Sequence, residues 1–162
     1  MRLPGSTALL LVLATSLACG IGQVSQDPPP APIGSLPNLS LTPGETFAGV
    51  TAEQVCTSGY AGRARNVLPE QYHQVYASYG IAYPEPAGSY ELDHLVPLEL
   101  GGDNSNRNLW PEPAAPAPGF HQKDELENYL HEAVCSGRLG LTDVQQGIAT
   151  AWYALYREYL NP

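Results

Sequence analysis

Basic residues are scarce in this chain of 162 residues, which has 7 lysines and arginines against 16 aspartates and glutamates. Its formal net charge is −9 at pH 7. Sequence-independent binding to duplex nucleic acid or to an anionic membrane depends on clustered lysine and arginine side chains. The composition therefore argues against a protein that binds by charge alone, although it is compatible with a local phosphate-binding site.

The sequence also lacks a hydrophobic run of the roughly 20 residues that a membrane-spanning helix needs. The shorter uncharged stretch Ala8–Ala18 follows Arg2 and is typical of the hydrophobic region of a signal peptide. Residues 15–19 resemble a bacterial lipobox, in which the cysteine carries the lipid, and an ordinary secretory signal is the alternative. We therefore predict a signal peptide at residues 1–18, lipidation of Cys19, and export to the bacterial cell envelope or beyond it.

Cysteine is rare as well, because the chain has three cysteines and no CxxC spacing. This pattern disfavours a structural zinc site. With Cys19 set aside, Cys56 and Cys135 remain as a pair, which in an oxidising compartment most simply forms one disulfide. Two unpaired buried thiols are the alternative. The disulfide would contribute roughly 4 kcal/mol in the chain-entropy model.

Proline, glycine and serine dominate the segment that follows the predicted signal peptide. Residues 20–44 contain them without helical or strand periodicity, which is typical of an extended tether. The remaining residues, 45–162, have the length of one ordinary domain. We therefore predict a tether at 19–44 and a single domain at 45–162.

Apolar residues recur at helical spacing in three segments of this domain: 69–79, 123–134 and 142 to about 160. Between the first two, residues 90–96 alternate as in a strand, and residues 108–110 are typical of a short strand that Pro111 ends. The order strand, turn, strand, loop, helix predicts an α+β fold. We expect a hairpin-plus-helix core with flanking helices, and a fold that is mostly helical overall.

Three motifs of this region resemble the HNH, or ββα-metal, endonuclease superfamily. They are LDHLVPLELGG at 92–102, NLWPE at 108–112 and KDELE at 123–127. Small exported bacterial HNH-like proteins have a similar pattern, DHLxPLELGG…NLWPE…KDxLE. The resemblance implies a ββα-metal core and a metal-dependent endonuclease that acts on DNA or RNA outside the cytoplasm.

The resemblance also implies roles for individual residues. His94 matches the general base that takes a proton from the attacking water, and Asp93 matches a metal ligand. Asn108 matches the central asparagine, which holds the loop and orients His94. A neutral imidazole suits a base near pH 7. The implied cation, Mg²⁺ or Mn²⁺ with Zn²⁺ as an alternative, would lie between hairpin and helix and stabilise charge on the phosphate.

The helix departs from the family pattern, because HNH enzymes usually place a histidine or asparagine there to complete the metal site. We predict that Asp124, a hard oxygen ligand, and His121 complete it, with Glu127 next in order. Lys123 is predicted to bind phosphate. Lys123 and Glu127 could instead form an ion pair, since they are four residues apart on one helix.

Other readings of the same motifs stay open. The chain could be a non-catalytic envelope lipoprotein that uses an HNH-like scaffold as a binding or structural module, since a fold does not fix a function. A metal site could also serve only to hold the hairpin to the helix. Arg63, Arg65 and Arg107 could bind phosphates, but they are interpreted as surface charges. The predicted partners are weakly and non-specifically bound nucleic acid and, through the lipid on Cys19, a membrane; the protein is predicted to be a monomer.

Overall fold

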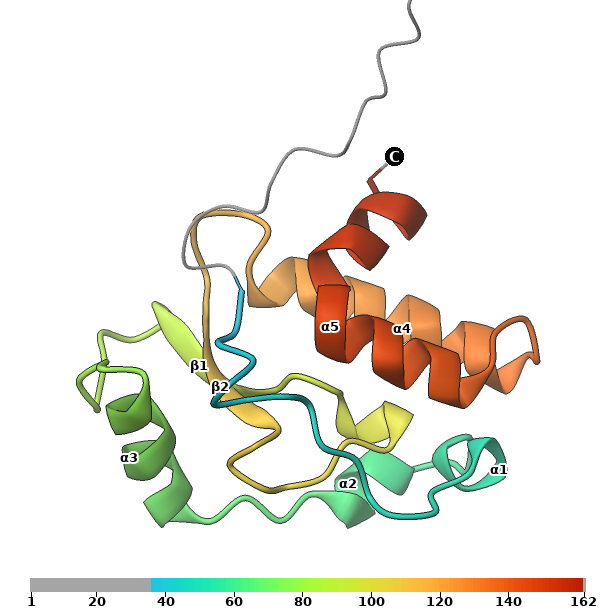
Figure 1. The fold of residues 1–162 in the computed structure, drawn as a ribbon, viewed down its shortest axis with the longest axis horizontal. Coiled ribbons are helices and arrows are strands. Elements are labelled where there is room, and N and C mark those ends of the chain that lie inside the picture. Colours follow the sequence, from blue (N-terminus) through green and yellow to red (C-terminus); the bar gives the residue numbers. More distant parts are fainter. Residues whose placement is uncertain (1–35, 162) are drawn as a thin grey trace, which may run out of the picture.

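A computed structural model describes residues 36–161 of the chain, and Figure 1 shows its fold. The fold is α+β, with several helices and one small antiparallel sheet. The predicted signal peptide, the predicted lipidation site Cys19 and the first part of the predicted tether lie outside the described residues. Between residues 36 and 161, no helix is long and apolar enough to span a bilayer.

The sheet is a hairpin-like pair of strands, β1 (Tyr90–His94) and β2 (Leu109–Pro113). The sequence predicted that the second strand ends at Pro111, but β2 continues to Pro113. In a two-stranded sheet each strand has an open edge, and a proline is tolerated where its nitrogen faces that edge. The 3-10 helix η1 (Leu98–Leu100) lies in the connection between the two strands.

Three helices correspond to the predicted helical segments: α3 (Pro69–Ser78), α4 (Phe120–Cys135) and α5 (Leu141–Tyr159). Two further helices, α1 (Ala52–Val55) and α2 (Tyr60–Ala64), were not predicted, because so few residues show no helical periodicity. The two strands lie between α3 on one side and the α4–α5 pair on the other (Figure 1).

Two hydrophobic clusters hold these elements together. The larger cluster packs α4 and α5 against η1 and includes Leu126, Leu130 and Trp110, all of them buried. The smaller cluster packs α3 on the hairpin through Tyr76 and Leu109. Because α4 is fixed by its apolar face, its first turns are brought to the end of β1, where the candidate site lies.

The predicted disulfide between Cys56 and Cys135 is confirmed. It joins the residue that follows α1 to the last residue of α4, across a sequence separation of 79. In addition, α1 contacts both α4 and η1, and α2 contacts η1. The short N-terminal helices therefore form one wall beside the strand connection.

The folded region begins before the predicted domain boundary at Glu45. Thr42 is fully buried, and its hydroxyl donates a hydrogen bond of 2.9 Å to the main-chain oxygen of Leu109. The main-chain N–H of Gly44 donates to the oxygen of Arg107. This segment is therefore packed along the start of β2. Its composition resembles a tether, but its hydrogen bonds to a distant strand could not be seen in the sequence.

Candidate functional site

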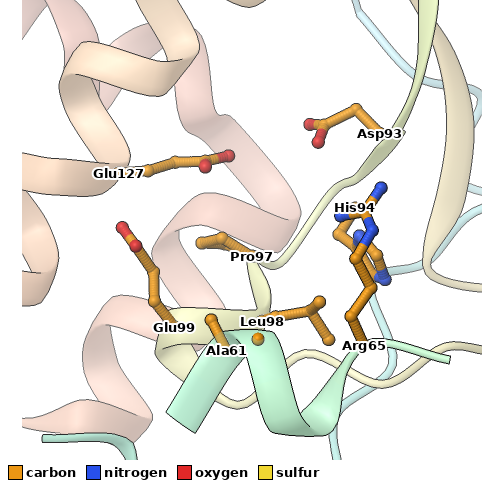
Figure 2. A pocket seen from close by; sticks show the side chains of 9 residues that line it. Ala61, Arg65, Asp93, His94, Pro97, Leu98, Glu99 and Glu127 are labelled. Carbon is orange, nitrogen blue, oxygen red and sulfur yellow. The ribbon is translucent and has the colours of Figure 1, made fainter. Parts of the chain in front are cut away.

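The ends of β1 and α4 border a cavity of about 270 Å³, whose other walls come from α2 and η1. The carboxylates of Asp93, Glu99 and Glu127 point into this space (Figure 2). On its other side Arg65 lies alongside His94 (Figure 2). We call this space the His94 cavity. It combines acidic and basic side chains from four separate segments of the chain.

A second cavity of about 460 Å³ shares Arg65, Asp93 and Glu127 with the His94 cavity. It is also lined by Glu91 and Asp124. Burial, together with the neighbouring carboxylates of Asp93 and Asp124, raises the pKa of Glu91 to about 7. We call this second space the acidic cavity, because carboxylates crowd its wall.

Asp93 and His94 both line the His94 cavity. Side chains of consecutive residues point to opposite faces of an ideal strand. Asp93 and His94 can therefore line one cavity only because the strand ends there. β1 ends at His94, and the N–H of Leu95 donates to the oxygen of Asn108 at 2.7 Å. The chain then turns away through Pro97, which also lines the cavity. The structure thus brings the two predicted site residues together.

The His94 imidazole is 2% exposed, and its Nε2 lies 3.3 Å from Oδ1 of Asn104. The same oxygen accepts a hydrogen bond from the N–H of Asn66, while the Asn104 amide nitrogen donates to the oxygen of Ala64. The Asn104 oxygen is therefore an acceptor, so Nε2 of His94 carries the proton. The lone pair on Nδ1 is then the site for an incoming proton.

The pKa of His94 lies below its usual range, and burial is the main cause. The Arg65 guanidinium lowers the pKa further, while the Asp93 carboxylate opposes both effects. The imidazole is therefore neutral at pH 7. A neutral imidazole is the form that a general base requires.

Asn108 is fully buried and holds the strand connection, as the resemblance implies. Its amide nitrogen donates to the oxygens of Val96 and Asp103, and its oxygen accepts from the N–H of Val96. The side chain that contacts the His94 ring, however, is that of Asn104. The predicted orienting role therefore belongs to a different asparagine of the same loop.

Lys123 is fully buried, and its ammonium group is surrounded by oxygen atoms from three elements. It donates hydrogen bonds to the carboxylates of Asp93 and Glu127 and, at 2.8 Å, to the main-chain oxygen of His94. A carboxylate oxygen of Glu112 lies 3.7 Å away. All three donor hydrogens are thus used inside the protein. The predicted phosphate-binding role of Lys123 does not fit this geometry.

The acids around Lys123 differ in how tightly they hold a proton. Burial alone would lower the pKa of Lys123 and raise that of Asp93, but their attraction reverses both effects. Burial raises the pKa of Glu112 well above its usual range, and together with nearby carboxylates it raises that of Glu127 to about 8 against the attraction of Lys123. Glu112 and Glu127 therefore hold a proton more tightly than Asp93, which is the acid that the ammonium keeps ionised most strongly.

The predicted metal ligands do not converge. Asp124 and Asp93 both line the acidic cavity, but His121 is exposed and lines neither cavity. Among residues 36–161, the one group of three histidine, cysteine or acidic ligand atoms within 4.8 Å of one another is Cys56, His131 and Cys135. Its two sulfur atoms are bonded to each other, so the thiolates that bind metals are absent.

A divalent cation between hairpin and helix does not fit the side chains as they stand. The Lys123 ammonium takes that position and uses an oxygen of Asp93 and an oxygen of Glu127. A cation there would need the ammonium to leave. Asp93 and Asp124, at the wall of the acidic cavity, offer the oxygen atoms that Mg²⁺ and Mn²⁺ prefer. They do not form a group of three ligands with His121.

The sequence did not reveal the roles of Arg65, Asn104 and Glu112. Glu112 belongs to the NLWPE motif, and Asn104 belongs to the polar turn after the paired glycines. Both segments were therefore noticed in the sequence, but nothing in either segment singled out these two residues. Arg65 was interpreted as a surface charge. Its guanidinium forms no hydrogen bond or ion pair within the described part of the chain, yet it lines both cavities.

No protein-family model, curated protein or solved structure matches this chain. The chemistry of the site therefore has to be read from its own residues. A neutral buried imidazole can accept a proton, and an unpaired guanidinium beside it can bind an anion. Placed around one cavity, these two groups are suited to an anionic substrate that water attacks.

Proposed function

We propose that this protein hydrolyses phosphodiester bonds in DNA or RNA, as an endonuclease with His94 as the general base. The observation that carries the proposal is the shared cavity of His94 and Arg65, with Asp93 beside them. The HNH resemblance adds to it, because His94 ends β1, Asn108 precedes β2, and α4 packs against β1 and η1.

In this proposal Arg65 replaces Lys123 as the phosphate-binding residue. A guanidinium presents paired N–H donors that match two phosphate oxygens, and the Arg65 guanidinium forms no hydrogen bond or ion pair among residues 36–161, although Glu91 attracts it. Bound in this way, a phosphodiester would lie next to His94. The imidazole would take the proton of a water molecule at Nδ1 as that water attacks phosphorus, and Asn104 would keep the ring in place.

The proposed cation, Mg²⁺ or Mn²⁺ with Zn²⁺ as an alternative, has no assembled three-ligand site at the junction of hairpin and helix. We therefore assign no step of the reaction to it. The acidic surroundings and the net charge of −9 favour a weakly and non-specifically bound substrate. Export, lipid attachment at Cys19 and a monomeric state complete the proposal.

The test is cleavage of plasmid DNA, single-stranded DNA and RNA by the purified protein, in Mg²⁺, Mn²⁺, Zn²⁺ and EDTA separately. His94→Ala should abolish cleavage. Arg65→Ala should lower kcat/KM by at least about tenfold, the effect of losing one charged phosphate contact. Arg63→Ala is the matched control, because Arg63 is two residues away, on α2, and donates to the oxygen of Ser58.

The pH dependence of cleavage gives an independent check. The rate should rise with pH through the pKa of His94, which lies below 6.5 in the folded protein. Activity should therefore persist at mildly acidic pH, where an ordinary histidine would be protonated. Equal cleavage by wild type and His94→Ala at every pH would contradict the assignment.

A second candidate function is favoured by the Lys123 cluster. The buried ion pairs of Lys123 with Asp93 and Glu127 are typical of a structural network, which suits a non-catalytic envelope module on an HNH-like scaffold. This alternative predicts no cleavage of any substrate with any cation. It also predicts that Arg65→Ala lowers binding of a fluorescent oligonucleotide while His94→Ala leaves that binding unchanged.

A further inference from the structure

The Lys123 ammonium lies where three elements meet. Asp93 and the main-chain oxygen of His94 belong to β1, Glu112 belongs to β2, and Glu127 belongs to α4. The side chain of Lys123 is 1% exposed. Oxygen atoms from separate elements around one buried positive centre are the arrangement by which a protein holds a hard cation.

Glu112 shows that this environment is built for positive charge. It is fully buried, and its side chain interacts with the carboxylate of Asp93 as well as with the ammonium. Its nearest positive group is the ammonium at 3.7 Å. Burying a carboxyl group is costly, and the attraction of the Lys123 ammonium offsets part of that cost for Glu112.

We propose that the Lys123 ammonium is a built-in cation of the hairpin–helix junction, in the position where the HNH resemblance implies a divalent metal ion. Lys123 is the single lysine of the chain, and it is covalently part of α4. Its three donor hydrogens bind oxygens that a metal ion would otherwise coordinate. The junction is therefore assembled without any dissolved cation.

The consequence for the site is that its geometry is independent of metal supply. Lys123 binds both the carboxylate of Asp93 and the main-chain oxygen of His94, so the peptide that carries the imidazole is fixed from within. This inference does not depend on nuclease activity. It also replaces the hypothesis of a structural metal that holds hairpin to helix.

The first experiment compares the purified wild-type protein in EDTA and in millimolar Mn²⁺, Mg²⁺ or Ca²⁺. The melting temperature should differ by less than about 1 °C, because a ligand stabilises a fold only by binding it. Mn²⁺ binding is then titrated by the electron paramagnetic resonance of the free ion. Wild type should show no one-to-one Mn²⁺ site whose affinity falls in the Glu127→Gln variant. Tight Mn²⁺ binding that Glu127→Gln abolishes, or a stabilisation of several degrees, would overturn the proposal.

The second experiment removes the ammonium. Lys123→Met leaves Asp93, Glu112 and Glu127 around a vacant position, so the variant should melt at a lower temperature than wild type and bind one Mn²⁺. Mn²⁺ should raise its melting temperature, or allow it to refold if it is unfolded in EDTA. Adding Glu127→Gln to this variant should weaken that binding at least tenfold.

Lys123→Arg is the matched control, since it keeps the positive charge and should remain unresponsive to Mn²⁺. A Lys123→Met variant that neither binds Mn²⁺ nor refolds with it would contradict the proposal. So would a Lys123→Met variant as stable as wild type in EDTA, because then the junction would need no cation at all. The wild-type measurement decides the matter even if every substitution of Lys123 prevents folding.

Discussion

The side-chain amide of Asn108 forms two hydrogen bonds with the main chain of Val96, one as donor and one as acceptor. The Asn108 nitrogen donates to the Val96 oxygen at 2.9 Å, and the Val96 N–H donates to the Asn108 oxygen at 2.8 Å. The same nitrogen also donates to the oxygen of Asp103. One side chain thus joins both ends of the connection between β1 and β2, which sets the position of His94.

Asn108→Ala should therefore destabilise the protein strongly. The substitution leaves two buried main-chain groups of Val96 and a part-buried oxygen of Asp103 without their partner, at about 1–3 kcal/mol for each buried group. We expect the free energy of unfolding, measured by urea denaturation, to fall by about 3 kcal/mol or more.

Asn106→Ala is the control for this variant. Asn106 lies in the same loop but is exposed, and its bonds are to the side chains of Gln71 and Gln74. A loss of less than about 1 kcal/mol is expected there. Equal losses for the two variants would show that the loop does not depend on the Asn108 contacts.

Gly102→Ala should also disrupt this loop. A Cβ atom at Gly102 would lie 1.7 Å from the oxygen of Val96, far inside contact distance, so the backbone would have to move. We expect a loss of stability of about 3 kcal/mol or more, or failure to fold. Gly62→Ala is the control, because a Cβ there meets no atom within 4 Å and a helical alanine is favourable. Thermal melting of both variants checks the contrast.

The sequence predicted the elements that have a strong local pattern. Lys123 to Val134 carries a single apolar stripe, and Leu126, Leu130 and Ala133 are buried as the stripe requires. Strand β1 was predicted for the same reason, from its alternating residues. The helices α1 and α2 have no such pattern, because they are too short to show a period.

Contacts at long range could not be predicted in the same way. The i, i+4 spacing of Lys123 and Glu127 indicated that they could form an ion pair. Nothing in the sequence indicated that Glu112 lies beside them. That contact depends on the register of β1 against β2. Arg65 reaches the His94 cavity because α2 packs on η1, a tertiary contact without a sequence signal.

Glu99 should make the stability of the protein depend on pH. Its Oε1 is buried without a hydrogen-bond partner among residues 36–161, and burial raises its pKa above 4.5, with Asp124 adding to the effect and His131 opposing it. A carboxyl whose pKa is raised by folding binds more protons in the folded state. Its contribution to stability is therefore lost as pH rises from 4.5 through the folded pKa.

Glu99→Gln should remove this dependence. The variant should melt at a higher temperature than wild type at about pH 8, and the difference should shrink toward about pH 4. Melting curves by circular dichroism across this range provide the measurement. Glu125→Gln, at an exposed position of α4, is the matched control. A constant difference at all pH values would rule out titration of Glu99 as the cause.

Removing the disulfide should lower stability by roughly 4 kcal/mol, since the bond closes a loop of 79 residues. The double variant Cys56→Ala and Cys135→Ala tests this by urea denaturation. Cys19→Ala keeps the pair and should denature at the same urea concentration as wild type. Reduction of wild type should lower the free energy of unfolding about as much as the double substitution does. No such loss on reduction would show that the disulfide is not formed in solution.

The disulfide also determines how the protein responds to a cut in its backbone. His94, Asn108 and Lys123 all lie between Cys56 and Cys135 in the sequence. A protease that cleaves once in an exposed stretch of that interval, such as residues 86–88, leaves two fragments that remain covalently joined. The packed strands and helices can then keep the site assembled after a single cleavage. Fragments should separate on a denaturing gel only after reduction.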